Sequence, residues 1–463
     1  MSGTNNQGRL SADAKAALLN RMRSASPGVA APATAATPHY DTSFATLPGF
    51  EQLKLMHAAT NAFGIPNPFF RTHEARAGAT SVIDGKEVIN FASYDYLGLN
   101  GAPEVMAAAH GAVDAFGTSV SASRIVAGER AFHRTFEREL ADVYGAEDAI
   151  VYVSGHAANV ATIGTLVGPR DVVFHDELMH NSAIVGAQLS RAHRRWFAHN
   201  DLDALETMLA AERASYGRAL IVVEGNYSMD GDAPDLARLI DLKQRYGAWL
   251  MVDEAHGLGV LGPKGLGVFE AQGLDPKAVD IWMGTLSKTL ASCGGYIAGS
   301  KDLVDYLKLS APGFVYSVGL SAPATLAALT ALRLMRQEPE RVARLQANSA
   351  QFLAAAKAAG LDTGAADGHA IVPVIVGDSL KAVVLSNLML DRGVNVLPII
   401  HPAVPNKAAR LRFFVTAAHT PEQIDATVAI LKEELPNTDV FIRKLAFAGI
   451  SDMLEGGAGA ARG

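Results

Sequence analysis

The 463-residue sequence contains a single cysteine, Cys293, so no disulfide can form within the chain and cysteine-rich zinc sites are excluded. It has no excess of positive charge either: 40 Lys and Arg against 47 Asp and Glu give a net charge of −7, which offers no general attraction to nucleic acid. No apolar run approaches the roughly 18 residues that a membrane helix needs. The first residues also lack a signal-peptide core. We therefore expect a cytoplasmic protein that binds no nucleic acid.

Hydrophobic residues make up 49% of the chain and charged residues only 19%. This balance favours compact folding over a solvated, disordered chain. On the usual prior of ~150 residues per domain, the length suggests about three units or one large enzyme with two lobes.

The first 46 residues differ from the rest in composition. Residues 10–23 have a helix-start signal at Ser11 followed by apolar positions at helical spacing, which predicts a short amphipathic helix. Residues 24–46 are rich in Ala, Pro, Ser and Thr, as in a flexible linker. We interpret residues 1–46 either as a loose tail or as a docking segment for a partner protein.

From about Leu47 to Leu361, short apolar runs alternate with helical stretches, the pattern of a mostly parallel sheet covered on both faces. The expected strands lie at 149–153, 171–174, 219–223, 249–252, 280–283 and 296–298. A smaller α/β lobe follows, with strands at 371–376, 394–398 and 411–416 and helices at about 380–392 and after Thr420. The fold class is α/β. We expect a segment at 47–100 that packs on the small domain, a large domain at 101–345, a small domain at 346–440 and a tail at 441–463.

Three of the apolar runs end in polar groups. One leads into Glu224 and Ser228, another into Asp253 and His256, and the run at 280–283 leads to Thr285 and Lys288. In open α/β sheets, ligands bind outside the carboxyl ends of the strands, so we expect these side chains to converge in one crevice.

The set suits pyridoxal phosphate (PLP) chemistry. A lysine such as Lys288 forms a Schiff base with the cofactor aldehyde, and an acid such as Asp253 keeps the pyridine nitrogen protonated so that the ring accepts electrons. Upstream, the strand and small-residue turn at 151–157 lead into a helix whose first N–H groups could hold a phosphate. Each motif is weak alone, because most lysines after a strand are simply solvated.

The order and spacing of the motifs together resemble the α-oxoamine synthases, a branch of the fold-type I PLP enzymes. The resemblance runs from about Ile89 to Leu431. It is carried by the motifs at 93–99 (SYDYLGL), 154–159 (SGHAAN), 195–201 (RWFAHND), 224–231 (EGNYSMDG), 252–257 (VDEAHG), 284–288 (GTLSK) and 412–419 (RFFVTAAH). It implies a large domain with a seven-stranded sheet, a smaller C-terminal domain, and a homodimer with the active site at the subunit interface.

The resemblance also implies roles for individual residues. Lys288 looks like the Schiff-base lysine that moves the α-proton, and Asp253 like the partner of the pyridinium. His180 looks like the ring that stacks on the cofactor, while His256 and Ser228 are similar to the groups that bind its phenolic oxygen.

The phosphate would be held by backbone groups of Gly155 and His156 and by the Thr285 hydroxyl. The implied reaction is a decarboxylative Claisen condensation of an amino acid with an acyl thioester, giving an α-amino ketone and CO2.

Several positions depart from the family pattern. Ile400 stands where several members have an arginine for the substrate carboxylate, so we expect Arg412 to bind it instead, with His401 as a weaker candidate and a structural ion pair as the alternative for Arg412. Tyr94 resembles serine palmitoyltransferase, and Ser123 replaces the threonine of glycine-using members. The smaller side chain favours serine or alanine as substrate, although a methyl group decides only ~1–3 kcal/mol.

Two further features bear on partners. Tyr316 and Val318 stand where many members have hydroxyl residues that reach a neighbouring subunit's phosphate, so the dimer contact is expected to differ, with Ser317 as a substitute. The N-terminal segment resembles docking segments of assembly-line enzymes, which makes an acyl carrier protein a candidate acyl donor beside coenzyme A.

Other interpretations are weaker. The DEAH sequence at 253–256 lacks a phosphate loop, the GxGxxG at 257–262 does not open a helix directly after a strand, and the basic run at 191–196 is typical of a solvated face. His175 and His180 lack the spacing of a zinc site. The alternatives that remain are another fold-type I enzyme, such as an aminotransferase or aldolase, and a non-catalytic partner subunit, against which the presence of Lys288 argues.

Overall fold

The computed structural model describes residues 41–47, 49–50, 54 and 65–459. Contacts divide the chain into two units, residues 1–64 and 65–463. Within the first unit, a short 3-10 turn, η1 (Phe44–Thr46), is capped by Ser43, whose side chain accepts a hydrogen bond from the backbone N–H of Ala45. The helix expected at 10–23 lies outside the described residues.

A seven-stranded sheet forms the core of the large lobe in the described part of the chain, in the order β3-β9-β8-β7-β6-β4-β5. Its strands are β3 (Asp148–Tyr152), β4 (Val172–Asp176), β5 (His193–Phe197), β6 (Ala219–Glu224), β7 (Trp249–Asp253), β8 (Ile281–Thr285) and β9 (Gly295–Gly299). Six of them point in the same direction, while β9, which lies between β3 and β8, is antiparallel to both of its neighbours. The expected mostly parallel α/β sheet is confirmed.

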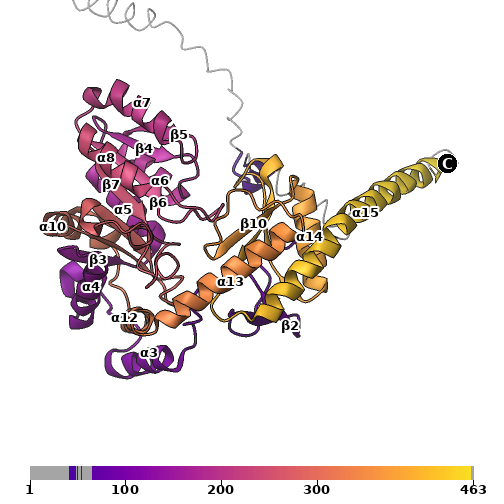
Figure 1. Ribbon diagram of the computed structural model, residues 1–463, viewed down its shortest axis with the longest axis horizontal. Coiled ribbons are helices and arrows are strands. Elements are labelled where there is room, and N and C mark those ends of the chain that lie inside the picture. Colours follow the sequence, from indigo (N-terminus) through magenta and orange to yellow (C-terminus); the bar gives the residue numbers. More distant parts are fainter. Residues whose placement is uncertain (1–40, 48, 51–53, 55–64, 460–463) are drawn as a thin grey trace, which may run out of the picture. The chain divides into compact units, whose positions relative to one another are not determined.

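Helices cover both faces of this sheet (Figure 1). The helices of the large lobe are α3 (Pro103–Phe116), α4 (Ala131–Val143), α5 (Gly155–Leu166), α6 (Asn181–Ser190), α7 (Leu202–Glu212), α8 (Leu236–Tyr246), α9 (Val268–Ala271), α10 (Lys301–Ser310), α11 (Pro312–Val315) and α12 (Ala322–Gln337). Alternation along β6 shows the arrangement: Leu220 and Val222 pack with α5, α6 and α10, whereas Ile221 and Val223 pack with α4, α7 and α8. A strand buried on both faces requires a continuous apolar run, which is what the sequence provides.

The edge strand β5 was not expected, because its sequence is polar. His193 and Arg194 are exposed, Trp196 is 61% exposed and only Phe197 is buried. The run at 191–196 is therefore solvated as predicted, but its backbone pairs with β4. Charged side chains on an edge strand discourage pairing with other chains.

The small lobe contains two three-stranded sheets among the described residues. One has the order β10-β13-β12 and the other the order β1-β2-β11, built from β1 (Thr80–Ile83), β2 (Lys86–Asn90), β10 (Ile371–Ile375), β11 (Val394–Asn395), β12 (Leu397–Ile399) and β13 (Arg410–Phe414). The pairing of β2 with β11 brings residues 80–90 onto the small lobe. Helices α14 (Ser379–Asp391) and α15 (Pro421–Gly459) complete it, so the tail expected at 441–463 is helical as far as Gly459.

The two lobes share one continuous helix, α13 (Pro339–Ala358), which passes between them in Figure 1. Its first half contributes Val342 and Leu345 to the core of the large lobe, and its second half contributes Phe352 and Ala356 to the core of the small lobe. The expected boundary at 345/346 thus falls inside a helix and not in a linker.

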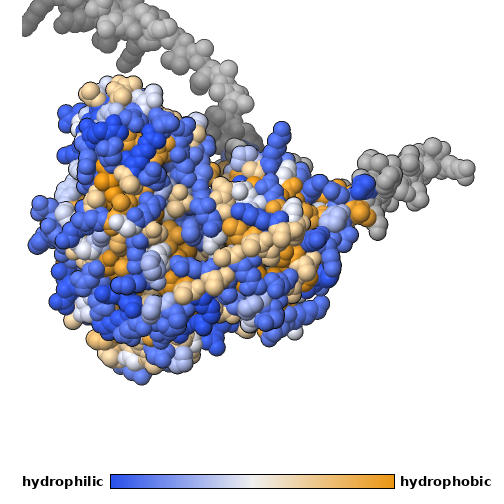
Figure 2. Space-filling model, in the orientation of Figure 1, coloured by the Kyte–Doolittle hydropathy of each residue, from blue (hydrophilic) through white to orange (hydrophobic). Residues whose placement is uncertain are grey.

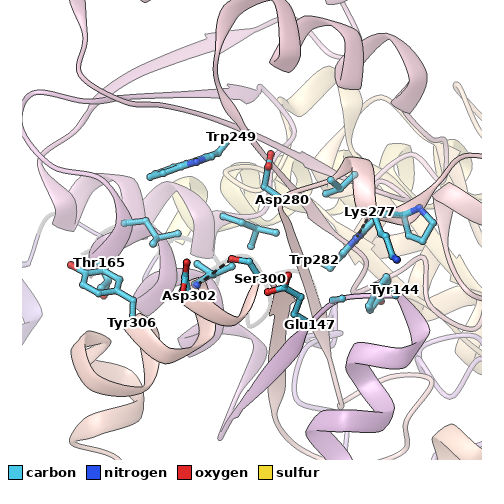
Figure 3. Close-up of a pocket in the computed structure, with 18 of the residues that line it drawn as sticks. Tyr144, Glu147, Thr165, Trp249, Lys277, Asp280, Trp282, Ser300, Asp302 and Tyr306 are labelled. Atoms are coloured by element: carbon cyan, nitrogen blue, oxygen red, sulfur yellow. Dashed lines mark hydrogen bonds between the residues drawn. The ribbon is translucent and has the colours of Figure 1, made fainter.

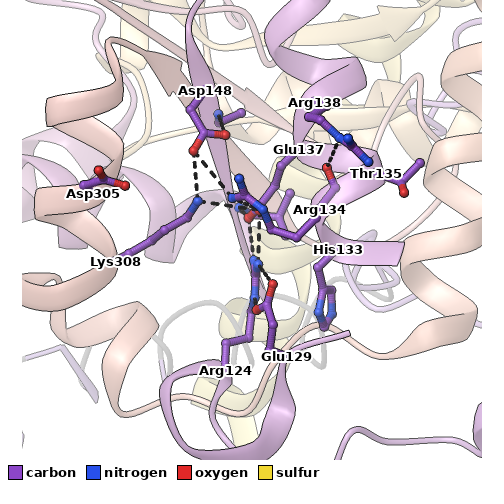
Figure 4. Close-up of polar contacts among 12 residues, drawn as sticks. Arg124, Glu129, His133, Arg134, Thr135, Glu137, Arg138, Asp148, Asp305 and Lys308 are labelled. Carbon is purple, nitrogen blue, oxygen red and sulfur yellow. Dashed lines mark hydrogen bonds and ion pairs between the residues drawn. The ribbon is translucent and has the colours of Figure 1, made fainter. Parts of the chain in front are cut away.

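A cluster of charged side chains fixes the loop that follows α3 (Figure 4). Arg124, at the start of the turn η2 (Arg124–Gly128), pairs with the fully buried Glu137 of α4 and with Glu129. Lys308 of α10 lies 3.2 Å from Asp148 and 3.7 Å from Glu137. Because breaking a buried ion pair leaves an uncompensated charge, this cluster holds the loop that carries Ser123 in place.

The face shown in Figure 2 is mainly hydrophilic, with apolar residues confined to small areas. None of the helices in the described ranges combines the length and apolar character needed to span a bilayer.

Candidate functional site

The carboxyl ends of the parallel strands bring the predicted residues together. Glu224, the last residue of β6, is paired in register with Asp253, the last residue of β7, and Asp253 is paired with Met283 of β8. β8 ends at Thr285, three residues before Lys288. The convergence expected from the strand order is therefore present.

Lys288 is enclosed in the protein, and this burial favours its neutral form. Burial lowers the pKa of Lys288 to about 8, even though Asp253 and Glu224 act in the opposite direction. Its Nζ lies 5.9 Å from the centre of the Tyr94 ring, which forms one wall of the site. A lysine with this pKa presents a substantial fraction of nucleophilic amine near neutral pH, as imine chemistry requires.

Asp253 is held by two hydrogen bonds. The Nδ2 group of Asn159, on α5, donates to one carboxylate oxygen and the backbone N–H of Ala255 donates to the other, each at 2.9 Å. Asn159 also donates to the Ser182 hydroxyl, which lies 2.6 Å from Nδ1 of His180. One chain of hydrogen bonds therefore orients both the expected pyridinium partner and the expected stacking ring.

His180 stands at the amino end of α6, where its ring accepts a hydrogen bond from the backbone N–H of Ser182. The ring is exposed on its open side but enclosed by protein elsewhere, and this partial desolvation lowers the pKa of His180 although Asp253 opposes the change. A neutral ring is the form suited to stacking on an aromatic cofactor.

His256 is buried and hydrogen-bonded to Tyr96, a residue that the sequence analysis did not single out. Its Nδ1 lies 2.7 Å from the hydroxyl of Tyr96. Burial, with help from Lys288 and Arg412, places the pKa of His256 well below its ordinary value, while burial raises the pKa of Tyr96. A neutral imidazole and a protonated phenol share this hydrogen bond, which fixes the orientation of the His256 ring in the site.

The amino end of α5 forms a cradle. The hydroxyl of Ser154 accepts a hydrogen bond from the N–H of Ala157, so it does not occupy the N–H groups of Gly155 and His156. A Cβ atom added at Gly155 would lie 2.9 Å from the hydroxyl oxygen of Thr285. The two elements thus approach so closely that only glycine fits, and the Thr285 hydroxyl lies beside the amino end of α5, where the first N–H groups of a helix have no partner within the helix.

Arg412, on β13, brings a positive charge from the small lobe. It donates to the backbone carbonyl of Ser228 at 2.8 Å, and its guanidinium lies over the Phe414 ring at 4.7 Å. Its Nε is buried and has no hydrogen-bond partner in the described residues. Arg412 forms no ion pair within the described residues. This favours the binding of a ligand over the structural ion pair that was the alternative role for Arg412.

Ser228 is buried, and its backbone N–H donates to Glu224 at 2.9 Å. Burial and the neighbouring Asp253 raise the pKa of Glu224 to about 8. Glu224 was noted in the sequence only as the end of a strand. Its place in the crevice was expected, but its raised pKa was not, because that arises from its register opposite Asp253 on the neighbouring strand.

Ser123 and His401 are not brought to this cluster. Ser123 lines a separate cavity of about 460 Å³ together with Val126 and residues 315–318. No hydrogen bond joins it to the residues around Lys288 within the described part of the chain. His401, in the turn after β12, is exposed.

A second cavity, of about 700 Å³, lies at the opposite ends of the strands (Figure 3). It is lined by Trp249 and Ile281, which begin β7 and β8, and by Tyr306 of α10. It includes none of the residues predicted for catalysis.

The residues at the carboxyl ends of the strands fit PLP. The cradle at Gly155 and Thr285 suits a phosphate, Asp253 is a fixed carboxylate for a pyridinium nitrogen, and Lys288 is an amine for the aldehyde. The His256 ring, held by Tyr96, is the group expected to bind the phenolic oxygen.

Comparisons with known proteins agree with this chemistry. The family model described as aminotransferase class I and II matches residues 86–431. A putative 8-amino-7-oxononanoate synthase of Gloeobacter violaceus is 43% identical over 363 residues, which cover 78% of this chain and 92% of that protein. The 8-amino-7-oxononanoate synthase of Methylococcus capsulatus is 41% identical, over 77% of this chain and 91% of that protein.

Solved structures show the same relationship. The serine palmitoyltransferase of Sphingomonas wittichii superimposes with a TM-score of 0.81 at 30% identity, covering 85% of this chain and 99% of that chain. The S. paucimobilis enzyme, solved with PLP and myriocin, gives the same score at 30% identity, with coverage of 85% and 99%. The 8-amino-7-oxononanoate synthase of Francisella tularensis has a TM-score of 0.67 at 27% identity, with coverage of 76% and 98%.

The chain therefore belongs to the aminotransferase class I and II family of PLP-dependent enzymes. Within that family it is an α-oxoamine synthase, a PLP-dependent acyltransferase that condenses an amino acid with an acyl thioester.

Proposed function

We propose that this enzyme condenses L-alanine or L-serine, in preference to glycine, with an acyl thioester and releases CO2 and an α-amino ketone. The observation that carries the proposal is the placement of Arg412. Within the described residues its Nε has no hydrogen-bond partner, and its charge is close enough to Lys288 to lower the pKa of that amine, which favours one substrate with an amino and a carboxylate group for both.

The names of the relatives favour alanine. An 8-amino-7-oxononanoate carries its amine and ketone on neighbouring carbons, with a methyl group beyond the amine, which is the skeleton of alanine after loss of its carboxylate. The structural similarity to serine palmitoyltransferases keeps serine as the second candidate. Ser123 favours alanine or serine over glycine only because it is smaller than the threonine that glycine-using members of the family have at this position.

The chain's own groups divide the work as follows. Bound PLP supplies an electron sink for the carbon next to the carboxylate. Lys288 anchors the cofactor aldehyde and then holds and returns the proton at that carbon. Asp253 keeps the ring nitrogen protonated, and Arg412 orients the substrate carboxylate. His180 covers one face of the ring, while His256 and Ser228 fix its phenolic oxygen.

The test is a panel of amino acids and acyl thioesters with product identification by mass spectrometry. We expect α-amino ketones from alanine or serine, at least tenfold above those from glycine. Turnover with an α-keto acid and no thioester would instead indicate an aminotransferase. Cleavage of a β-hydroxy amino acid without a thioester would indicate an aldolase, and failure to bind PLP would indicate a non-catalytic partner subunit.

We also propose an acyl carrier protein as an acyl donor beside coenzyme A, with residues 1–46 as its docking segment. Deleting residues 1–46 is expected to raise KM for the acyl-carrier substrate and to leave KM for the acyl-CoA unchanged. Equal use of both donors before and after the deletion would contradict the proposal.

A further inference from the structure

His199 joins two turns of the active site through both nitrogens of its ring. Nδ1 lies 3.0 Å and 3.1 Å from the two carboxylate oxygens of Asp176, and Nε2 lies 2.9 Å from a carboxylate oxygen of Asp232. Asp176 is fully buried and Asp232 is nearly so. The imidazole also meets the edge of the Tyr227 ring at 4.5 Å.

This geometry requires a charged ring. A neutral imidazole donates from only one nitrogen, so the other would direct its lone pair at a buried carboxylate. Burial alone would lower the pKa of His199, but hydrogen bonds to the two carboxylates outweigh it and raise the pKa to about 10. The same residue also neutralises two carboxylates that have no other cationic partner among the described residues.

Each aspartate belongs to a different turn. Asp176 ends β4, and its carboxylate accepts the backbone N–H groups of Leu178 and Asn200, so it shapes the turn that leads to His180. Asp232 closes the turn after β6, where its carbonyl accepts the N–H of Tyr227, next to Ser228. The Ser228 carbonyl in turn holds Arg412.

We propose that His199 is a positioning residue for the synthase reaction: as an imidazolium it ties the turn that carries His180 to the turn that carries Ser228, and thereby sets the place of Arg412. The inference rests on the proposed function because it assigns Arg412 to the substrate carboxylate. His199 itself does not touch substrate or cofactor. It acts through the two aspartates.

The experiment compares the holoenzyme with His199→Gln, Asp232→Asn and the double variant. A glutamine can donate to only one of the two carboxylates and carries no charge. We expect His199→Gln to keep bound PLP, to raise the amino-acid concentration needed for half of the visible absorbance change about tenfold, and to reduce kcat less than threefold. The visible circular dichroism of the bound cofactor should also change, since it reports the arrangement of His180 and Ser228 without any substrate.

The double variant tests whether His199 acts through its positive charge or only by filling the space between the two aspartates. If His199 serves to neutralise Asp232, then Asp232→Asn should restore part of the amino-acid affinity and of the unfolding midpoint lost in His199→Gln, so the two changes are non-additive. His133→Gln is the matched control, because His133 is a buried histidine with hydrogen bonds at both ring nitrogens, but to backbone groups of Arg130 and Leu320. It should leave the circular dichroism and the amino-acid affinity unchanged.

Strictly additive effects on stability, or a circular dichroism spectrum of His199→Gln that equals that of His133→Gln, would overturn the inference. A wild-type enzyme that binds PLP but responds to no amino acid would contradict the proposed function. In that case the unfolding midpoints of the single and double variants, together with the circular dichroism, would still decide the role of His199.

Discussion

Lys288 is the residue whose chemistry depends most directly on its surroundings. Since burial lowers its pKa to about 8, the cofactor-free protein holds about half of this amine in the neutral, nucleophilic form at that pH. We expect the rate of PLP uptake to rise with pH and to level off above about 8, whereas a free lysine side chain would continue to gain reactivity to about 10.5.

The measurement is the growth of visible absorbance after mixing cofactor-free protein with PLP at a series of pH values. Lys288→Ala should show no imine absorbance at any pH. A wild-type rate that still climbs between pH 9 and 10.5 would contradict the lowered pKa.

Arg412 gives a second prediction at this scale. Arg412→Lys keeps the charge but loses the planar pair of donors that suits a carboxylate, so the KM for the amino acid should rise ten- to a hundredfold, about 1.4–2.8 kcal/mol, with a smaller effect on kcat. Steady-state kinetics at saturating thioester measure both constants. Arg392→Lys is the matched control, because Arg392 pairs with Glu433 and Glu434 on the surface of the same lobe. Equal changes in both variants would argue against a carboxylate site.

At the scale of elements, α5 and the end of β8 approach each other closely in the site. Gly155→Ala would place a Cβ 2.9 Å from the Thr285 hydroxyl oxygen, so one of the two must move and the cradle for the phosphate is distorted. We expect at least a tenfold loss of PLP affinity, measured by titration of the cofactor-free protein. Gly164→Ala on the same helix meets only a carbonyl at 3.8 Å and should bind PLP as the wild type does. Comparable losses in both variants would assign the effect to the helix as a whole.

The turn after β7 carries a buried acid with a predictable effect on stability. Burial raises the pKa of Glu254 to about 8 from an ordinary 4.5, and its carboxyl is enclosed by Gly225, Gly257 and Gly267. Because the pKa is higher in the folded state, the stability this group contributes is fully present below pH 4.5 and is lost as the pH rises through 8.

Glu254→Gln removes this titration. The stability of the wild type relative to the variant should therefore fall between pH 5 and pH 8, by at most about 1.4 kcal/mol per pH unit. Denaturant unfolding of the cofactor-free proteins at several pH values measures the difference. A difference that stays constant with pH would show that Glu254 is ionised in the folded protein.

Elements and individual contacts were predictable from the sequence to different degrees. Buried strands such as β6 and β7 were identified because a short, continuous apolar run that ends in polar turn residues is typical of a strand buried on both faces. The edge strand β5 was missed because only one of its side chains is buried, so its pattern looks like a loop. Asn159 and Tyr96 were missed because their roles come from contacts with Asp253 and His256, about 94 and 160 residues away, which local patterns do not encode.

At the scale of the whole molecule, the small lobe completes the site. Arg412 reaches Ser228 from β13, and α13 passes without interruption from one core to the other. A rigid helix between two cores limits independent motion of the lobes. The position of Arg412 relative to Lys288 is thus set by packing along α13 as well as by the loops.

The last prediction concerns a second copy of the chain. Val126 is 79% exposed and Tyr316 is 86% exposed, and both line the cavity of about 460 Å³ that contains Ser123. Exposed apolar side chains gathered in this way mark an interaction surface, and the homodimer expected from the family would cover it and bring Ser123 toward the partner's site.

We expect the wild type to sediment at twice the chain mass of 48.7 kDa and Val126→Asp to sediment as a monomer with little synthase activity. Leu189→Asp, at a 67% exposed leucine at the end of α6, should remain a dimer. A fully active, monomeric wild type would refute the shared site, because Ser123 would then have no route to the reacting carbon.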